Sequence, residues 1–194
     1  MEGTNRALKA DYIIEKSFRT FSGIEEKLVP CFFICYQRKD EIFAKKVAEY
    51  ILYKTFDVYF DLEDNDLKQK NQSSDPKFVT NAIRIGLNKS DYMIVIVSPN
   101  TYKSLWVPFE IGYAYDKIKD ANMKILRHKE IERNSMPAYL SVKEILHGTT
   151  SLNKFLNSIR KQWPIYEDLL EKGEQIKTFS EYQTNPLNKY LDNE

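Results

Sequence analysis

The chain has 194 residues, of which 29 are Lys or Arg and 28 are Asp or Glu, so its formal net charge is +1. The hydrophobic fraction of 42%, with 13 Tyr and 11 Phe, indicates a folded globular protein and excludes an intrinsically disordered one. The charge balance argues against a dedicated nucleic-acid-binding protein, which usually carries a basic excess. Residues 29–163 alone carry a modest basic excess, which suits an anionic small ligand or an ordinary solvated surface equally well.

The two cysteines, Cys31 and Cys35, fall on the same predicted strand. Their Cα atoms would lie ~13 Å apart, which is beyond disulfide reach. Two unpaired thiols fit a reducing compartment. The sequence shows neither a signal peptide nor an apolar run long enough to span a bilayer. We therefore expect a soluble, cytoplasmic protein that binds no membrane and no nucleic acid.

Strand and helix patterns alternate from residue 31 onward. Apolar runs such as 31–36 and 92–98 are typical of strands buried on both faces, and the segments between them show helical periodicity. The predicted elements, in chain order, are strand 31–36, helix 40–54 with Asp40 near its start, strand 57–61, a polar loop at 62–77, a helix beginning at Pro76, strand 92–98, helix 104–119 with Ser104 as its cap, strand 123–127, strand 142–147 and helix 150–163.

This alternation predicts right-handed βαβ crossovers and hence an α/β protein, a flavodoxin-like doubly wound sheet of five parallel strands with helices on both faces. We expect one domain at 30–163, an N-terminal extension at 1–29 and a C-terminal extension at 164–194. Both extensions are predicted to be helical in part, at Tyr12, Ile13, Phe18, Ile165, Leu169 and Leu170. Ligands of such folds bind beyond the carboxyl ends of the strands, here the loops 37–39, 62–77 and 98–103.

Common catalytic and cofactor signatures are missing. The sequence has no glycine-rich phosphate loop and no nucleophile elbow. No Cys and His spacing predicts a zinc site, and His128 and His147 are expected to be structural. No metal and no resident cofactor are therefore expected.

Three segments resemble a known family. They are Phe32 to Tyr36 followed by Arg38-Lys39-Asp40, then Phe56 to Asp61, then Ser90 to Asn100 followed by Ser104 to Ile111. Together, in this order, they look like the Toll/interleukin-1 receptor homology domain, the TIR domain. The Trp106-x-x-x-Glu110 pattern at the start of a helix is the most diagnostic part, and the resemblance covers about residues 30–163.

In enzymatic TIR domains the helix glutamate cleaves the bond between nicotinamide and ribose in NAD, so the resemblance implies that Glu110 is catalytic and that NAD is the substrate. The chemistry is plausible independently, because a carboxylate beside the ribose stabilises the oxocarbenium-like cation that forms as the bond breaks. The helix N-terminus favours the ionised form of Glu110. An ordinary helix-terminal or solvated glutamate is the alternative.

Other residues are candidates for substrate binding. Tyr36 is expected to stack on a base, and Arg38 to pair with a pyrophosphate, with Gln37 lining the cleft between them. Asp61 would bond a ribose hydroxyl or merely cap the loop, and Arg38 could equally face solvent.

The third predicted helix is apolar on two sides. Val107, Ile111, Ala114, Tyr115 and Ile118 face the sheet, with Glu110 at the rim of this stripe. Trp106, Phe109 and Tyr113 occupy the opposite face, which predicts an interface for self-association. Packing against the C-terminal extension is the alternative, and Trp106 could also stack on a ligand ring.

Two departures from the family pattern refine the expectation. Cys35 replaces the usual Ser, and the loop 62–77 lacks the Pro-Gly pattern of receptor and adaptor TIR domains. The chain looks more like standalone bacterial TIR proteins, in particular the TIR component of the Thoeris antiphage system. That resemblance implies a cyclic ADP-ribose-type signal that activates a separate effector. A non-catalytic TIR interaction module and a glycosidase acting on free nucleosides are the alternatives.

Overall fold

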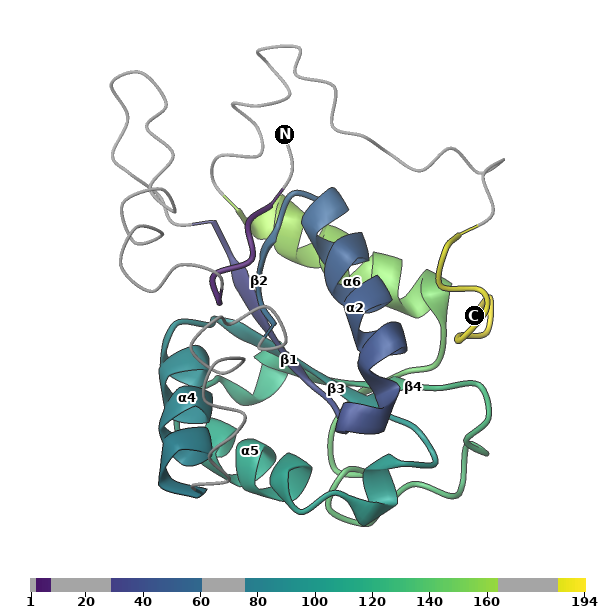
Figure 1. The fold of residues 1–194 in the computed structure, drawn as a ribbon. Helices are drawn as coiled ribbons and strands as arrows, with labels where there is room; N and C mark the ends of the chain where they lie inside the picture. Colours follow the sequence, from purple (N-terminus) through teal and green to yellow (C-terminus); the bar gives the residue numbers. More distant parts are fainter. Residues whose placement is uncertain (1–2, 8–28, 61–75, 164–184) are drawn as a thin grey trace, which may run out of the picture.

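The computed structural model describes residues 3–7, 29–60, 76–163 and 185–194. A five-stranded parallel sheet, in the order β2-β1-β3-β4-β5, forms the centre of the molecule (Figure 1). The strands are β1 (Cys31–Cys35), β2 (Asp57–Tyr59), β3 (Tyr92–Val97), β4 (Met123–Arg127) and β5 (Ile145–Leu146). The helices are α2 (Glu41–Tyr53), α4 (Pro76–Asn88), α5 (Trp106–Tyr115) and α6 (Thr149–Gln162). The predicted doubly wound α/β fold is confirmed.

Helices cover both faces of the sheet, α2 and α6 on one and α4 and α5 on the other (Figure 1). The alternation of side chains along a strand explains how one strand serves both cores. Phe32 and Ile34 of β1 pack under α2 and α6, whereas Phe33 and Cys35 pack under α4 and α5. Burial on both faces is why β1 and β3 are continuous apolar runs.

Two elements are shorter than the sequence predicts. The strand expected at 142–147 is reduced to Ile145–Leu146, because it is the last strand of the sheet and pairs only with β4, while Val142 is 69% exposed. The helix expected at 104–119 runs from Trp106 to Tyr115. Ser104 acts at its start as expected, since its Oγ accepts from Val107 N at 3.2 Å.

One residue of the third helix was placed wrongly. Val107, Ile111, Ala114 and Ile118 are buried against the sheet as predicted, but Tyr115 is 47% exposed. With ~100° of rotation per residue, Tyr115 lies roughly 70° from the centre of that stripe and is also the last residue of α5. Its ring instead lies under the ammonium group of Lys143.

The N-terminal segment extends the sheet beyond β2. Asn5 forms a parallel bridge with Val58, with Arg6 N donating to Val58 O at 2.7 Å and Val58 N donating to Thr4 O at 3.1 Å. Residues 3–7 therefore cover the free edge of β2. The helical positions expected at Tyr12, Ile13 and Phe18 lie outside the described residues.

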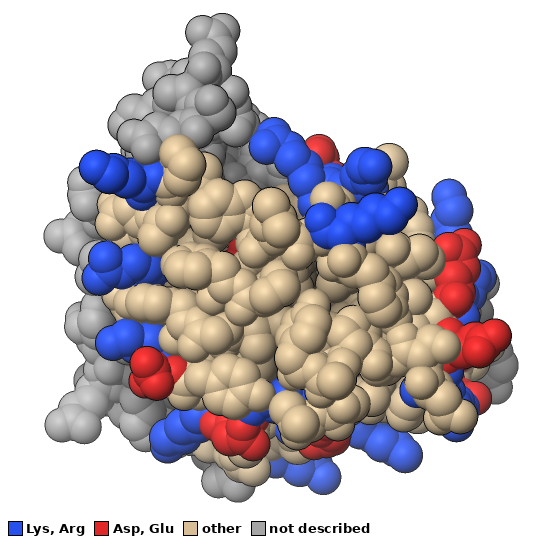
Figure 2. Space-filling view, turned by 90° about the horizontal axis from the view of Figure 1, so that it is seen from below, with Lys and Arg blue, Asp and Glu red and all other residues tan. Residues whose placement is uncertain are grey.

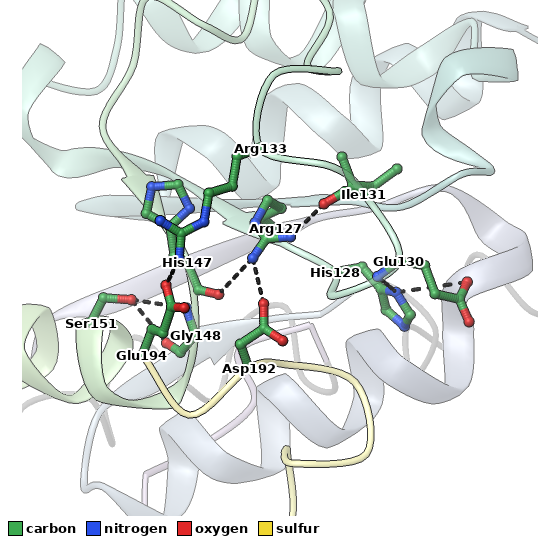
Figure 3. A network of polar contacts seen from close by, with 10 residues as sticks. All are labelled: Arg127, His128, Glu130, Ile131, Arg133, His147, Gly148, Ser151, Asp192 and Glu194. Atoms are coloured by element: carbon green, nitrogen blue, oxygen red, sulfur yellow. Dashed lines mark hydrogen bonds and ion pairs between the residues drawn. The ribbon is translucent and has the colours of Figure 1, made fainter.

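The C-terminal segment 185–194 packs into the same domain, over α2 and α6. Leu187 and Leu191 are buried in that core, and Asp192 forms a parallel bridge with Gly148. Figure 3 shows how the acidic side chains of this segment meet Arg127 and Arg133 near the start of α6. The positions expected to be helical at Ile165, Leu169 and Leu170 lie outside the described residues.

Two further expectations concern the environment of the chain. Cys31 and Cys35 are both buried, and neither forms a disulfide, as predicted. Among the helices that the structure describes, none is both long and apolar enough to cross a membrane.

Candidate functional site

The topology places a switch point between the carboxyl ends of β1 and β3. The chain leaves β1 through α2 towards β2 and leaves β3 through α5 towards β4, and these helices lie on opposite faces of the sheet. Such a switch point is where doubly wound folds bind ligands. Figure 2 views the molecule from the side on which β1 leads into α2, and shows a broad uncharged surface with Lys and Arg towards its margins.

The loop after β1 forms one side of the switch point. Tyr36 is partly buried, with its ring 5.4 Å from that of Phe60. Gln37 begins the 3₁₀ turn η1 (Arg38–Asp40), where its side chain accepts from Lys39 N. Arg38 is exposed in this turn. The three predicted binding residues of this loop are therefore held together next to the switch point.

The loop after β3 forms the other side and is fixed by its own hydrogen bonds. Ser98 N donates to Thr101 Oγ1 at 3.0 Å, and Thr101 Oγ1 donates to Ile96 O at 3.2 Å. Asn100 N donates to Ser98 Oγ at 3.0 Å. The 3₁₀ turn η3 (Thr101–Lys103) follows and leads into α5. The start of α5 is thus anchored to the end of the central strand.

Asp40 joins the two sides. Its Oδ2 accepts from Ser98 Oγ at 2.5 Å, and its Oδ1 accepts from Asn100 Nδ2 at 2.7 Å. The sequence places Asp40 near the start of a helix and in the first segment that resembles the family, but it does not single out Ser98 and Asn100 as individual site residues. One sequence signal was available: polar side chains come directly after two buried strands. The carboxyl ends of adjacent parallel strands lie at the same edge of the sheet, so such side chains come close together.

Glu110 is carried by α5, which this loop leads into. The predicted catalytic glutamate is 9% exposed, so it is more buried than its expected place at the rim of the helix stripe. The neighbouring Val107 and Ile111 anchor the helix to the sheet. A carboxylate in such a position is screened less by water than a surface one.

The predicted aromatic face of α5 is present as a row of rings. The centroids of Trp106 and Phe109 are 5.9 Å apart in an edge-on arrangement, and those of Phe109 and Tyr113 are 6.5 Å apart and stacked. Trp106 and Phe109 are each 37% exposed. The described C-terminal residues 185–194 pack on the opposite face of the sheet, so they do not cover this row. Asp61, the remaining predicted binding residue, lies outside the described residues.

Several titratable groups around the sheet have shifted pKa values. Burial lowers the pKa of His128, at the end of β4, against the opposing effect of the Glu130 and Asp40 carboxylates. The ring packs edge-on against the stacked rings of Phe43 and Tyr190, which fits the structural role expected for it. Burial raises the pKa of the Cys31 thiol to about 12, so the group stays protonated and unreactive at neutral pH.

Fold and site together define a doubly wound α/β domain with a network of polar side chains at its switch point and a buried glutamate on the helix that follows. The sequence of residues 32–147 matches the TIR domain family, and the chain belongs to it. A search of curated proteins finds no match. TIR domains include both NAD-cleaving enzymes and non-catalytic adaptors, and they self-associate.

Proposed function

We propose that this TIR protein cleaves NAD at the bond between nicotinamide and ribose, with Glu110 as the catalytic carboxylate. The observation that carries the proposal is the position of Glu110: 9% exposed, on the helix that leads away from the switch point of a TIR domain. NAD enters as the substrate, and no resident cofactor or metal is required by this chemistry.

The reaction requires a carboxylate but no strong general acid. Nicotinamide leaves as a neutral molecule when the C–N bond breaks, and the bonding electrons go with it. The positive charge that develops on the ribose is stabilised by the Glu110 carboxylate more strongly in the transition state than in the ground state. Water then adds to the ribose carbon, giving ADP-ribose and releasing a proton.

The loop residues supply binding. Arg38 would pair with the pyrophosphate, since a guanidinium matches phosphate oxygens in two parallel hydrogen bonds. Tyr36 would stack on a base, with Gln37 between them, and Trp106 and Asp61 would contact the ligand from α5 and from the end of β2. This arrangement agrees with the exposure of Arg38 on η1.

The finer form of the proposal concerns the product. If an adenine nitrogen of the same NAD molecule adds to the ribose carbon in place of water, the product is a cyclic ADP-ribose-type nucleotide. That outcome requires exclusion of water from the pocket. A diffusible cyclic product would activate a separate effector, as the resemblance to the Thoeris antiphage TIR component implies. On this proposal the protein acts in the cytoplasm.

A non-catalytic interaction module is the second candidate. It is favoured by the apolar surface around the start of α5, where Leu105 is 88% exposed and Tyr102 is 47% exposed beside the aromatic row. Exposed apolar patches of this kind mark protein contacts. The two candidate functions differ in the expected effect of removing the Glu110 carboxylate, which would abolish catalysis but leave an interaction module unaffected.

The deciding experiment is NAD turnover by the purified protein over a wide range of protein concentration, with the products separated and identified. Glu110→Gln should lower kcat by at least about 10²-fold, because an interaction specific to the transition state is lost. The matched control is Glu132→Gln at an exposed glutamate, which should leave kcat unchanged. Full activity of a folded Glu110→Gln protein would refute the catalytic role, and absence of turnover by the wild type at every concentration would favour the interaction module.

A further inference from the structure

Asp40 occupies a helix-capping position but does not cap the helix. It precedes α2, where an aspartate usually accepts from the amides of the first turn, yet its side chain makes no such bond. Both carboxylate oxygens instead cross to the neighbouring loop, to Ser98 Oγ at 2.5 Å and Asn100 Nδ2 at 2.7 Å. The carboxylate therefore makes no stabilising cap for α2 and instead spans the switch point.

The bonds from Asp40 to Ser98 and Asn100 form a tie that connects two loops with different expected roles. On one side, η1 holds Gln37 and Arg38 immediately before Asp40. On the other side, Ser98 and Asn100 belong to the hydrogen-bonded loop that leads through η3 to α5 and Glu110. Beyond the paired ends of β1 and β3, the two loops are therefore joined by the two bonds of one carboxylate.

We propose that Asp40 is a positioning residue for the NAD-cleaving site, acting through Ser98 and Asn100 to hold the binding loop in register with the helix that carries Glu110. Because both of its oxygens already accept hydrogen bonds from the protein, it is not assigned a contact with the substrate. This inference rests on the proposed function, since the register matters for catalysis only if the switch point binds NAD.

A double-mutant cycle on the full chain tests the inference. Asp40→Ala removes both bonds and should lower kcat for NAD by about 10²-fold, the cost of misplacing reacting groups by about 1 Å. Asn100→Ala removes one of the two bonds and should lower kcat by a smaller factor. The double variant should lose no more than Asp40→Ala, because Asp40→Ala has already removed the bond that Asn100→Ala breaks. Glu41→Ala, which removes the adjacent exposed carboxylate, is the matched control and should retain the wild-type kcat.

Two results would overturn the inference. If the losses multiply in the double variant, Asp40 acts on the substrate independently of Asn100; if kcat is unchanged in the folded single variants, the tie has no role in positioning. A purely structural role would lower the melting temperature without changing the kcat of the remaining folded protein. Asn100→Ala keeps the test valid if Asp40→Ala does not fold.

Failure of the proposed function can be told apart from failure of this inference. If the wild type does not cleave NAD, the same variants are compared by amide hydrogen exchange, which needs no substrate. The tie predicts faster exchange of the amides of Ser98, Asn100 and Thr101 in Asp40→Ala than in the wild type and Glu41→Ala. Unchanged protection of these amides would refute the positioning role.

Discussion

At the scale of single residues, the least expected feature is a buried ion pair between the N-terminal segment and the sheet. Arg6 Nε donates to Asp57 Oδ2 at 3.0 Å, and the two side chains are only 10% and 2% exposed. The other guanidinium nitrogens donate to the carbonyl oxygens of Lys89 and Val29. Asp57 Oδ1 accepts from Thr4 N at 2.8 Å. Each charge is therefore satisfied only while both partners are present.

Removing one partner should be costly because the other stays buried. Asp57→Asn takes away the counter-charge of Arg6 and should lower the free energy of unfolding by about 3–5 kcal/mol, measured by urea denaturation. The control is Lys46→Ala, which breaks an ion pair to Glu49 whose side chains are 47% and 45% exposed. That change should cost less than about 1 kcal/mol. If both variants lose less than about 1 kcal/mol of unfolding free energy, the buried pair stabilises the fold no more than the surface pair does.

At the scale of elements, the sequence predicts those strands and helices that have a local pattern of apolar residues. The sequence predicts strand β3 with nearly the observed bounds and helix α4 with the observed start at Pro76, because a β-branched apolar run and apolar residues at positions 79, 83 and 87 are periodic signals. The pairing of Asn5 with Val58 was missed, since no local pattern relates residues 53 positions apart. The bonds of Asp40 were missed for the same reason, and the shortness of β5 follows from its place at the sheet edge.

Helix α5 belongs to two environments at once. One side is buried against the sheet through Val107, Ile111 and Ala114, and this side carries the packing energy. The other side presents the aromatic row formed by Trp106, Phe109 and Tyr113, and Arg84 of α4 donates from Nε to the Tyr113 hydroxyl at 3.4 Å. That contact lowers the pKa of Tyr113. The row is thus supported from α4 at Tyr113, while Trp106 and Phe109 are each 37% exposed.

The exposed end of the row should matter for association more than for folding. The double variant Trp106→Ser/Phe109→Ser should reduce concentration-dependent self-association in sedimentation velocity, because these side chains offer apolar area to a second copy. The cost to folding should be about 1–2 kcal/mol for each, since each side chain is 37% exposed and loses only part of the burial of a core residue. Ile42→Ser, at a 72% exposed apolar residue on α2, is the control. Unchanged association of the double variant would exclude the row as the interface.

At the scale of the whole molecule, both described terminal segments complete the sheet. Asn5 pairs beyond β2, and Asp192 pairs with Gly148 directly after β5. The family match ends at residue 147, yet Tyr190 stacks on Phe43 of α2 with ring centroids 4.7 Å apart. Arg127, only 3% exposed, pairs with Asp192 (Figure 3). Residues 185–194 are therefore part of the domain in physical terms, although the sequence suggested an extension.

The packing of residues 185–194 predicts that they stabilise the fold as much as a buried helix or strand does. Leu191 is 2% exposed in the core formed by α2 and α6, so Leu191→Ala should leave a cavity and lower the free energy of unfolding by about 2–5 kcal/mol in urea denaturation. Asn193→Ala, two positions along at an exposed residue, should change it by less than about 0.5 kcal/mol. A loosely attached extension would instead unfold independently, and both variants would then match the wild type. Because Tyr190, next to Leu191, stacks on Phe43 in the first turn of α2, the loss should also appear as faster amide exchange in that turn.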